Sequence, residues 1–258
     1  MKVIFSIALM LAAVAVLSFS VPAQASGQDD QIESSAKQSY VFKNYLKDDE
    51  IKIKSKDGVV SLTGTVSEES HKLLAAETVA SLPGVKSVDN KLEVKEEKHD
   101  EMSDAWIMTK VKTTLLFHRN VSGFKTEVDV KDGIVTLRGE ADNQAQKDLA
   151  TEYVKDIEGV KDVKNEMAVA KPAKESSKGT KDIRTIGDKI DDASITAMVK
   201  TTLLYHRSTS GLQTKVETKN GVVTLSGKAK NAAEKDLATK LAKDVKGVED
   251  VNNRMTIE

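Results

Sequence analysis

The sequence contains no cysteine among its 258 residues, only three prolines, and 4% aromatic residues. The absence of cysteine excludes disulfide bonds, thiolate catalysis and cysteine-ligated zinc. The formal net charge is −1, so bulk electrostatics gives no support for nucleic-acid binding. With 31% charged residues, the composition predicts small cores with highly solvated surfaces rather than one large core.

The N-terminal residues have the pattern of an export signal. Lys2 precedes an almost wholly apolar run from Val3 to Val21, and Ala23 and Ala25 then form an A-x-A pattern. This predicts a secretory signal peptide cleaved after Ala25. The alternative is an uncleaved membrane anchor, because the apolar run is about long enough to span a bilayer. An exported, cysteine-free and highly charged chain is typical of a bacterial periplasm, which is the predicted location.

A repeated pattern sets the domain organisation. The stretches KDGVVSLTG, KDGIVTLRG and KNGVVTLSG are followed by PGVKSV, EGVKDV and KGVEDV. In each case the glycines are separated by steps of 6 and then 20 residues, which predicts three homologous modules. The motif glycines, which we interpret as structural, are Gly58, Gly64, Gly84, Gly133, Gly139, Gly159, Gly221, Gly227 and Gly247.

The boundaries follow from the repeat and from the composition between its copies. We predict a signal peptide at 1–25, repeat 1 at 34–95, repeat 2 at 103–170, a linker at 171–190 and repeat 3 at 191–258. The linker is rich in Lys, Ser and Gly, which is typical of a flexible connection. A module of about 60 to 70 residues has a marginal core, so packing between modules is expected to add stability.

Each repeat begins with a helix pattern followed by a hairpin pattern. In repeat 3, Ile195, Val199 and Leu203 recur at helical spacing, which predicts one buried helix face. The two extended runs of TKVETKNGVVTLSGKA flank Asn-Gly, a strong hairpin signal. The last glycine of the hairpin motif predicts close approach of another element over the sheet.

A second helix and a final strand complete the predicted module. Asn231 with Glu234 predicts a capping-box-like start, and Leu237, Leu241 and Val245 form the predicted buried stripe. The following G-V-x-x-V segment predicts the end of the helix and a last strand. The predicted fold class is α+β: three tandem αββαβ modules, each with two helices on one face of a three-stranded mixed sheet.

The pattern [DN]-G-[VI]-V-[ST]-L-x-G, then a helix, then G-V-x-x-V, resembles the BON domain, named for bacterial osmotic-stress and nodulation proteins. All three modules match. With a signal peptide and no lipid-anchored cysteine, the chain is similar to the osmotically inducible protein Y group, which has two such domains where this chain has three. The resemblance implies a non-enzymatic role in envelope integrity, with phospholipid binding or chaperone-like help to envelope proteins.

No catalytic arrangement is evident in the sequence. The four histidines, His71, His99, His118 and His206, form no H-x-x-x-H or H-E-x-x-H motif, and there is no G-x-S-x-G or P-loop. The scattered carboxylates suit helix starts and solvated faces. We therefore predict no catalytic residue, no metal site, no cofactor and no nucleic-acid partner; the oligomeric state is left open.

The repeated stretches TTLLFHRNVSGF and TTLLYHRSTSGL are the candidate functional segments. Repeat 1 is about five residues shorter at this place and lacks them. One interpretation is structural: His and Arg near a helix C-terminus can meet free carbonyls and the negative end of the dipole. The other is a membrane or partner contact in which an aromatic side chain enters the headgroup zone while Arg pairs with phosphate. The residues concerned are Phe117, His118, Arg119, Phe124, Tyr205, His206, Arg207 and Leu212.

Three candidate functions follow from these interpretations. The first is weak binding of anionic phospholipid or envelope proteins, with the modules together gaining avidity. The second is a chaperone-like holdase for unfolded envelope proteins, and a scaffold that spaces two partners is a third. Trp106, the single tryptophan, is compatible with a place in the core or at an interface.

Overall fold

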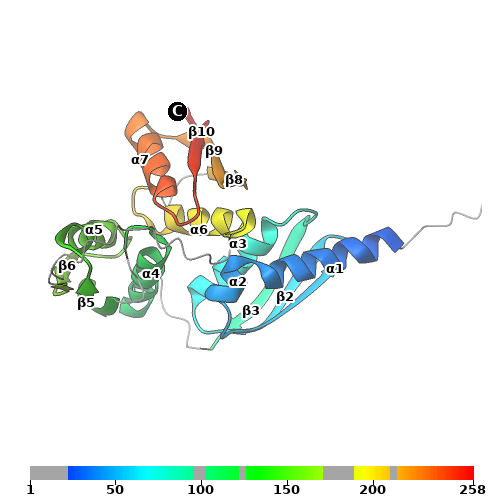
Figure 1. Ribbon diagram of the computed structural model, residues 1–258, viewed down its shortest axis with the longest axis horizontal. Helices are drawn as coiled ribbons and strands as arrows, with labels where there is room; N and C mark the ends of the chain where they lie inside the picture. Colours follow the sequence, from blue (N-terminus) through cyan, green and yellow to red (C-terminus); the bar gives the residue numbers. More distant parts are fainter. Residues whose placement is uncertain (1–22, 96–102, 122–125, 171–188, 210–213) are drawn as a thin grey trace, which may run out of the picture.

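The computed structural model describes residues 23–95, 103–121, 126–170, 189–209 and 214–258 (Figure 1). The predicted signal peptide up to residue 22 and the predicted linker from 171 to 188 lie outside the described residues. No helix in the described part of the chain is long and apolar enough to cross a membrane.

Three modules follow one another along the chain. Module 1 contains α1 (Ala23–Gln38), α2 (Tyr40–Asn44), β1 (Glu50–Lys56), β2 (Val59–Val66), α3 (Glu69–Ala80) and β3 (Ser87–Val94). Module 2 contains α4 (Asp104–Phe117), β4 (Thr126–Lys131), β5 (Ile134–Ala141), α5 (Gln144–Lys155), β6 (Asp162–Asn165) and β7 (Ala168–Val169). Module 3 contains α6 (Asp192–Tyr205), β8 (Thr214–Lys219), β9 (Val222–Ala229), α7 (Ala232–Lys243), β10 (Asp250–Asn253) and β11 (Thr256–Ile257).

Each module has the predicted α+β architecture with a mixed sheet. In module 1 the central strand β2 pairs antiparallel with β1 and parallel with β3. The same arrangement surrounds β5 and β9 in the other modules. The antiparallel pair is the predicted hairpin, and α3, α5 or α7 is the crossover that a parallel pair requires. The predicted fold class is confirmed.

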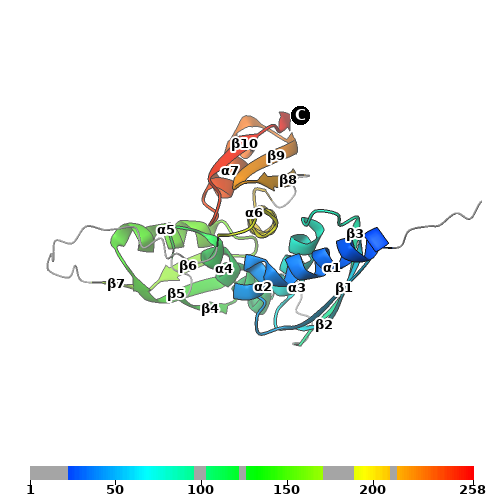
Figure 2. The same ribbon diagram turned by 45° about the vertical axis from the view of Figure 1, so that its right-hand side comes forward.

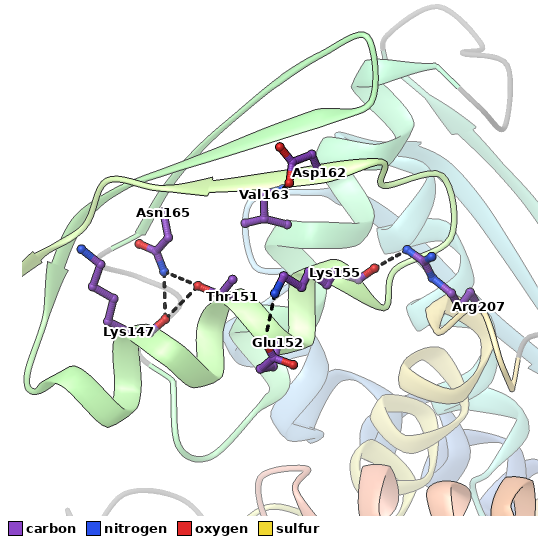
Figure 3. Close-up of polar contacts among 8 residues, drawn as sticks. All are labelled: Lys147, Thr151, Glu152, Lys155, Asp162, Val163, Asn165 and Arg207. Carbon is purple, nitrogen blue, oxygen red and sulfur yellow. Dashed lines mark hydrogen bonds and ion pairs between the residues drawn. The ribbon is translucent and has the colours of Figure 1, made fainter.

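The third strand of modules 2 and 3 is interrupted, which the sequence pattern did not predict. The Asn165 side chain donates to the carbonyl of Lys147 and the hydroxyl of Thr151, both at 2.8 Å (Figure 3), and accepts from the Met167 amide at 3.1 Å. These bonds tie the break to helix α5 and turn Met167 into the core, where it is 3% exposed. Asn253 forms the same bonds in module 3.

Module 1 has one more helix than predicted, because its first helix breaks at Ser39. The Ser39 hydroxyl accepts from the Phe42 amide at 3.4 Å and donates to the Ala36 carbonyl at 2.8 Å. Serine is a favourable N-cap because its side-chain oxygen satisfies a free amide of the first turn. Helix α2 therefore starts in a new direction and brings Val41 and Phe42 into the core.

A carboxylate of the first helix holds the hairpin turn in every module, from the first residue of α4 and α6 and from the middle of α1. In module 3 the Asp192 carboxylate accepts from the Asn220 amide at 2.8 Å and the Gly221 amide at 2.9 Å. Asn220 and Gly221 have positive φ values of 50° and 76°, as a type I′ hairpin turn requires. Asp29 and Asp104 make the equivalent bonds to the turns of modules 1 and 2.

The last hairpin glycine of module 1 lies close to the backbone of the neighbouring strand. Gly64 has a φ of 115°, and a Cβ atom there would lie 1.9 Å from the carbonyl oxygen of Glu50. Glu50 belongs to the neighbouring strand β1. Gly64 is therefore needed for its backbone conformation beside the paired strand, and the close approach of another element over the sheet at Gly227 stays a prediction.

Helices join the modules, and the sheets face away from one another (Figures 1 and 2). Helix α3 of module 1 packs against α6 of module 3, and α4 of module 2 contacts both. Modules 1 and 3 share one hydrophobic core, which also receives Phe117 from module 2, whereas the rest of module 2 has a core of its own. Packing between modules, expected from their small size, is thus extensive.

The predicted buried stripes hold for the first helices and only partly for α7. Ile195, Val199 and Leu203 are all buried. On α7 the buried residues include Ala238, Leu241 and Ala242, while Leu237 is only partly buried. Leu241 and Val245 of the predicted stripe are therefore buried, and Leu237 is the member that is only partly so.

Candidate functional site: the interface between modules 2 and 3

The two His-Arg segments lie at the interface between modules 2 and 3. Phe117 is 1% exposed, His118 1%, Tyr205 2% and His206 8%. In this arrangement the four side chains contact protein, and a membrane could reach them only if the modules separated. Phe124 and Leu212, the other apolar residues of the predicted set, lie outside the described residues.

Arg119 of module 2 binds the end of helix α7 in module 3. Its guanidinium donates to the carbonyl oxygens of Val245 at 3.0 Å and Val248 at 2.5 Å, and its amide donates to the carbonyl of Asp244 at 3.0 Å. The Lys246 amide donates in return to the carbonyl of Phe117 at 3.0 Å. The last carbonyls of a helix have no intrahelical partner and form the negative end of its dipole, so the arginine satisfies them.

Arg207 of module 3 makes the reverse contact with helix α5 in module 2. Its guanidinium donates to the carbonyl of Lys155 (Figure 3). The guanidinium also donates to the carbonyl of Val160 at 3.0 Å, and the Arg207 amide donates to the carbonyl of Asp156 at 2.8 Å. The Glu158 amide donates to the carbonyl of Tyr205 at 3.1 Å. We call the two contacts together, 117–119 with 244–248 and 205–207 with 156–160, the reciprocal interface.

This geometry refines the structural interpretation of the motif. The arginines do meet free carbonyls at a helix end, as one of the two predictions proposed for His and Arg together, whereas within the described residues the histidine side chains do not. The carbonyls belong to the second helix of the other module, however, and not to the helix that carries the motif.

His118 occupies an unusual environment within the reciprocal interface. Its ring stacks on Tyr153, with 3.7 Å between centroids and 4° between planes, and neither ring nitrogen has a hydrogen-bond partner among the described residues. Burial lowers the pKa of His118 to about 4; Asp244 partly offsets this, while Lys246 and His206 reinforce it. The ring is therefore neutral at pH 7.

The ring nitrogens of His206 have partners, unlike those of His118 within the described part of the chain. Its Nε2 atom lies 3.6 Å from the carboxylate of Asp156, and its Nδ1 atom accepts from the Ser208 amide at 3.2 Å. Burial lowers the pKa of His206, Asp156 raises it, and Arg207 lowers it further. In module 3 the equivalent carboxylate, Asp244, instead accepts from the Tyr153 hydroxyl at 3.0 Å.

Aromatic side chains extend this interface toward module 1. Trp106 lies edge-on to Tyr205, with 5.9 Å between ring centroids, and the Lys110 ammonium sits 5.6 Å from the Trp106 ring. Phe117 contacts Tyr45 of module 1, with 5.3 Å between centroids. Of the two places considered for Trp106, the structure therefore gives it a place between modules.

A pocket of ≈ 400 Å³ opens at the centre of the reciprocal interface. Equivalent residues of modules 2 and 3 line it from both sides. The pairs are Thr114 with Thr202, His118 with His206, Leu149 with Leu237, Glu152 with Lys240, Tyr153 with Leu241 and Asp156 with Asp244.

The remaining titratable cluster does not have the geometry of a catalytic triad. The Nδ1 atom of His71 lies 2.6 Å from Asp49 and 3.0 Å from the Ser67 hydroxyl. In a triad the serine and the carboxylate contact different ring nitrogens, whereas here both contact the same one. Within the described residues, no group of three or more His, Asp or Glu side chains could hold a metal ion.

Comparison with known families assigns the fold. The BON domain model matches residues 28–96, 103–171 and 191–258. The chain belongs to the BON domain family. The first match includes Asp29, whose carboxylate accepts from the amides of the hairpin turn.

Related sequences agree with this assignment. The chain is 35% identical over 152 residues to "Osmotically-inducible protein Y" of Escherichia coli (strain K12), over 59% of this chain and 71% of that protein. It is 29% identical over 150 residues to an uncharacterized protein in the gshII 5′ region of Anaplasma centrale, over 58% of this chain and 91% of that protein. The predicted similarity to the protein Y group is confirmed.

Among solved structures, one similar chain is the C-terminal domain of CdsD, a structural protein of the type III secretion system of Chlamydia trachomatis. It is 16% identical, with a TM-score of 0.23, over 89% of this chain and 96% of that one. With a TM-score this low, the similarity supports no conclusion about the present chain.

Proposed function

We propose that the protein is a non-enzymatic periplasmic protein of osmotic or envelope stress that binds anionic phospholipid. Its relative is named for osmotic induction, and the N-terminal pattern favours export with cleavage after Ala25. With Phe117 and Tyr205 buried, the lipid-binding surface that we favour is the open face of the module 1 sheet.

A row of lysines on that face carries the proposal. Lys52, Lys54 and Lys56 alternate with inward-facing residues along β1, and all three are exposed. The Nζ atom of Lys54 lies 3.8 Å from a carboxylate oxygen of Glu33, and the Lys54 side chain is 83% exposed. Within the described residues neither Lys52 nor Lys56 forms an ion pair. The equivalent positions are Glu127, Asp129 and Lys131 in module 2, and Lys215, Glu217 and Lys219 in module 3.

The binding free energy expected from three lysines corresponds to weak, reversible binding. A lysine close to an anionic membrane surface contributes about 1 kcal/mol, and the attraction falls off within a Debye length of about 10 Å at 0.1 M salt. Three aligned lysines therefore predict binding that is measurable at low salt and is lost at high salt. This contact leaves the reciprocal interface intact.

Co-sedimentation with phosphatidylglycerol vesicles tests the proposal. We expect the full chain to bind at low salt, and the triple variant K52E/K54E/K56E to lose binding. The matched control is K215E/K219E on the equivalent strand of module 3, which we expect to retain it. The variant F124S/L212S tests the predicted loop contact separately. No binding by the parent protein at low salt would rule out the lipid function, and equal loss in the lysine variant and its control would rule out the module 1 face.

A holdase for unfolded envelope proteins is the second candidate function. It is favoured by the exposed leucines Leu149 and Leu204, which are 36% and 44% exposed and border pockets between modules. It predicts suppressed aggregation of a denatured outer-membrane protein without lipid, reduced by Leu149→Ser together with Leu204→Ser. Unchanged aggregation at molar excess of the parent protein would exclude this function.

A further inference from the structure

The pocket at the reciprocal interface has a negatively charged rim. Its lining contains the carboxylates of Glu152, Asp156 and Asp244 and a single ammonium, that of Lys240. Glu152 already pairs with Lys155 at 3.2 Å, so Asp156 and Asp244, which face the pocket from opposite modules, are the available carboxylates. Among the described residues each accepts one side-chain contact, from His206 or from Tyr153, and a carboxylate has about four acceptor sites.

The buried histidine is an independent sign that the pocket receives a ligand. His118 lines the pocket and is 1% exposed, yet both of its ring nitrogens lack a hydrogen-bond partner within the described residues. Buried polar groups are nearly always hydrogen-bonded, and each exception calls for an explanation. A neutral imidazole has one acceptor nitrogen and does not repel a cation, so a ligand that donates hydrogen bonds would satisfy it.

The remaining walls of the pocket are aliphatic. Leu149 of α5 and Leu237 of α7 line the space together with Ile157 and Leu241. Leu149 is 36% exposed although it lies at the centre of a contact between modules. A largely apolar pocket with a few polar groups of one charge selects a ligand with a hydrocarbon body and a complementary charged end. Its volume of ≈ 400 Å³ lies within the range of small-molecule sites.

We propose that this pocket binds an aliphatic ammonium group held between Asp156 and Asp244. The source of the group is a free alkyl diamine or the lysine side chain of a partner protein. This inference is independent of the lipid-binding function, because the pocket and the module 1 lysines lie on different parts of the molecule.

Calorimetry of the full chain at pH 7.5 and constant ionic strength tests the inference. The probes are hexane-1,6-diamine, its uncharged analogue hexane-1,6-diol, the anion hexanoate, and the peptide acetyl-Leu-Lys-Leu-amide. The variants are D156N and D244N, with D236N on the outer side of α7 as the matched control. Asp236 is exposed and is not part of the pocket lining. Trp106 fluorescence confirms in each variant that the reciprocal interface is intact.

We expect the diamine or the peptide to bind, and the diol and hexanoate to bind at least tenfold more weakly. D156N and D244N should each weaken binding at least tenfold, whereas D236N should leave it unchanged. Tighter binding of the peptide identifies a protein segment as the source, and tighter binding of the diamine identifies a small molecule. Equal binding of the diol, equal affinity of D156N and the parent protein, or no binding of either ammonium probe would overturn the inference.

Discussion

The guanidinium of Arg119 donates a hydrogen bond of 3.0 Å to the carbonyl oxygen of Val245, which lies in another module and 126 residues further along the chain. Arg207 repeats this relationship in the opposite direction with the end of α5. Because each module supplies both the donor and the acceptor, loss of either arginine should loosen both modules.

Replacing the arginines should therefore lower stability markedly. A hydrogen bond to a charged group contributes about 1.5 to 3 kcal/mol, so R119A and R207A should each lower the free energy of unfolding by about 2 kcal/mol or more in urea titrations. R138A is the control, since Arg138 forms an exposed ion pair with Glu166 and such pairs contribute about 0 to 1 kcal/mol. Equal losses at Arg138 and Arg119 would contradict the assignment.

Acid should weaken the reciprocal interface through His118. The pKa of His118 is about 4 in the folded protein and about 6.5 when exposed. Between pH 4 and pH 6.5 the His118 imidazole is protonated in the unfolded chain but stays neutral in the folded protein. Stability is therefore greatest above about pH 6.5, falls as the pH drops toward 4, and loses about 3 kcal/mol in total from this group.

The measurement is urea unfolding monitored by Trp106 fluorescence from pH 7.5 to 4.5. In H118F, which retains an aromatic ring against Tyr153, the loss of stability over this range should be much smaller than in the parent protein. H71Q is the control, because His71 is partly exposed and lies outside this interface. An identical pH profile in H118F and the parent protein would refute the role of His118.

Substitution of Phe117 tests whether the His-Arg segment has a structural role or a membrane-binding role. Its ring is 1% exposed and packs against Tyr45, so F117A should destabilise the protein by about 3 to 5 kcal/mol. L204A truncates an exposed side chain and should change stability by about 1 kcal/mol or less. Thermal unfolding distinguishes the two, and a fully stable F117A would mean that the ring is not buried in solution.

The carboxylate at the first helix of each module should be needed for the hairpin turn. D192A removes the acceptor of the Asn220 and Gly221 amides and should cost about 1 to 3 kcal/mol. The amide resonance of Gly221 should move upfield as its hydrogen bond is lost. D250A, at an exposed position that begins β10, serves as the control and should leave that resonance in place.

The local periodicity of the sequence was sufficient for the module fold. Hairpins with Asn-Gly or Asp-Gly, apolar spacing such as that of Ile195 and Val199, and the glycines after the second helices all specify short-range structure. The interruption at Asn165 and the break at Ser39 were not predictable in this way, because each depends on a side chain that competes with the backbone for hydrogen bonds.

The reciprocal interface could not be derived from periodicity, because its partners are far apart in the sequence. One signal was nevertheless present. Modules 2 and 3 share a Lys-Asp pair at the end of the second helix, Lys155-Asp156 and Lys243-Asp244, where module 1 has Ala80-Ser81. Modules 2 and 3 thus have both this pair and the His-Arg motif, and module 1 has neither. This is expected if the two segments form the two sides of the reciprocal interface.

A distance measurement between modules 2 and 3 tests the central claim most directly. The chain has no cysteine, so Lys164→Cys with Asn252→Cys places one spin label on an exposed, equivalent strand position of each module. Double electron–electron resonance should give one narrow distance distribution, which R119A/R207A broadens while R138A does not. A broad distribution in the parent protein, or a narrow one that survives R119A/R207A, would contradict the reciprocal interface.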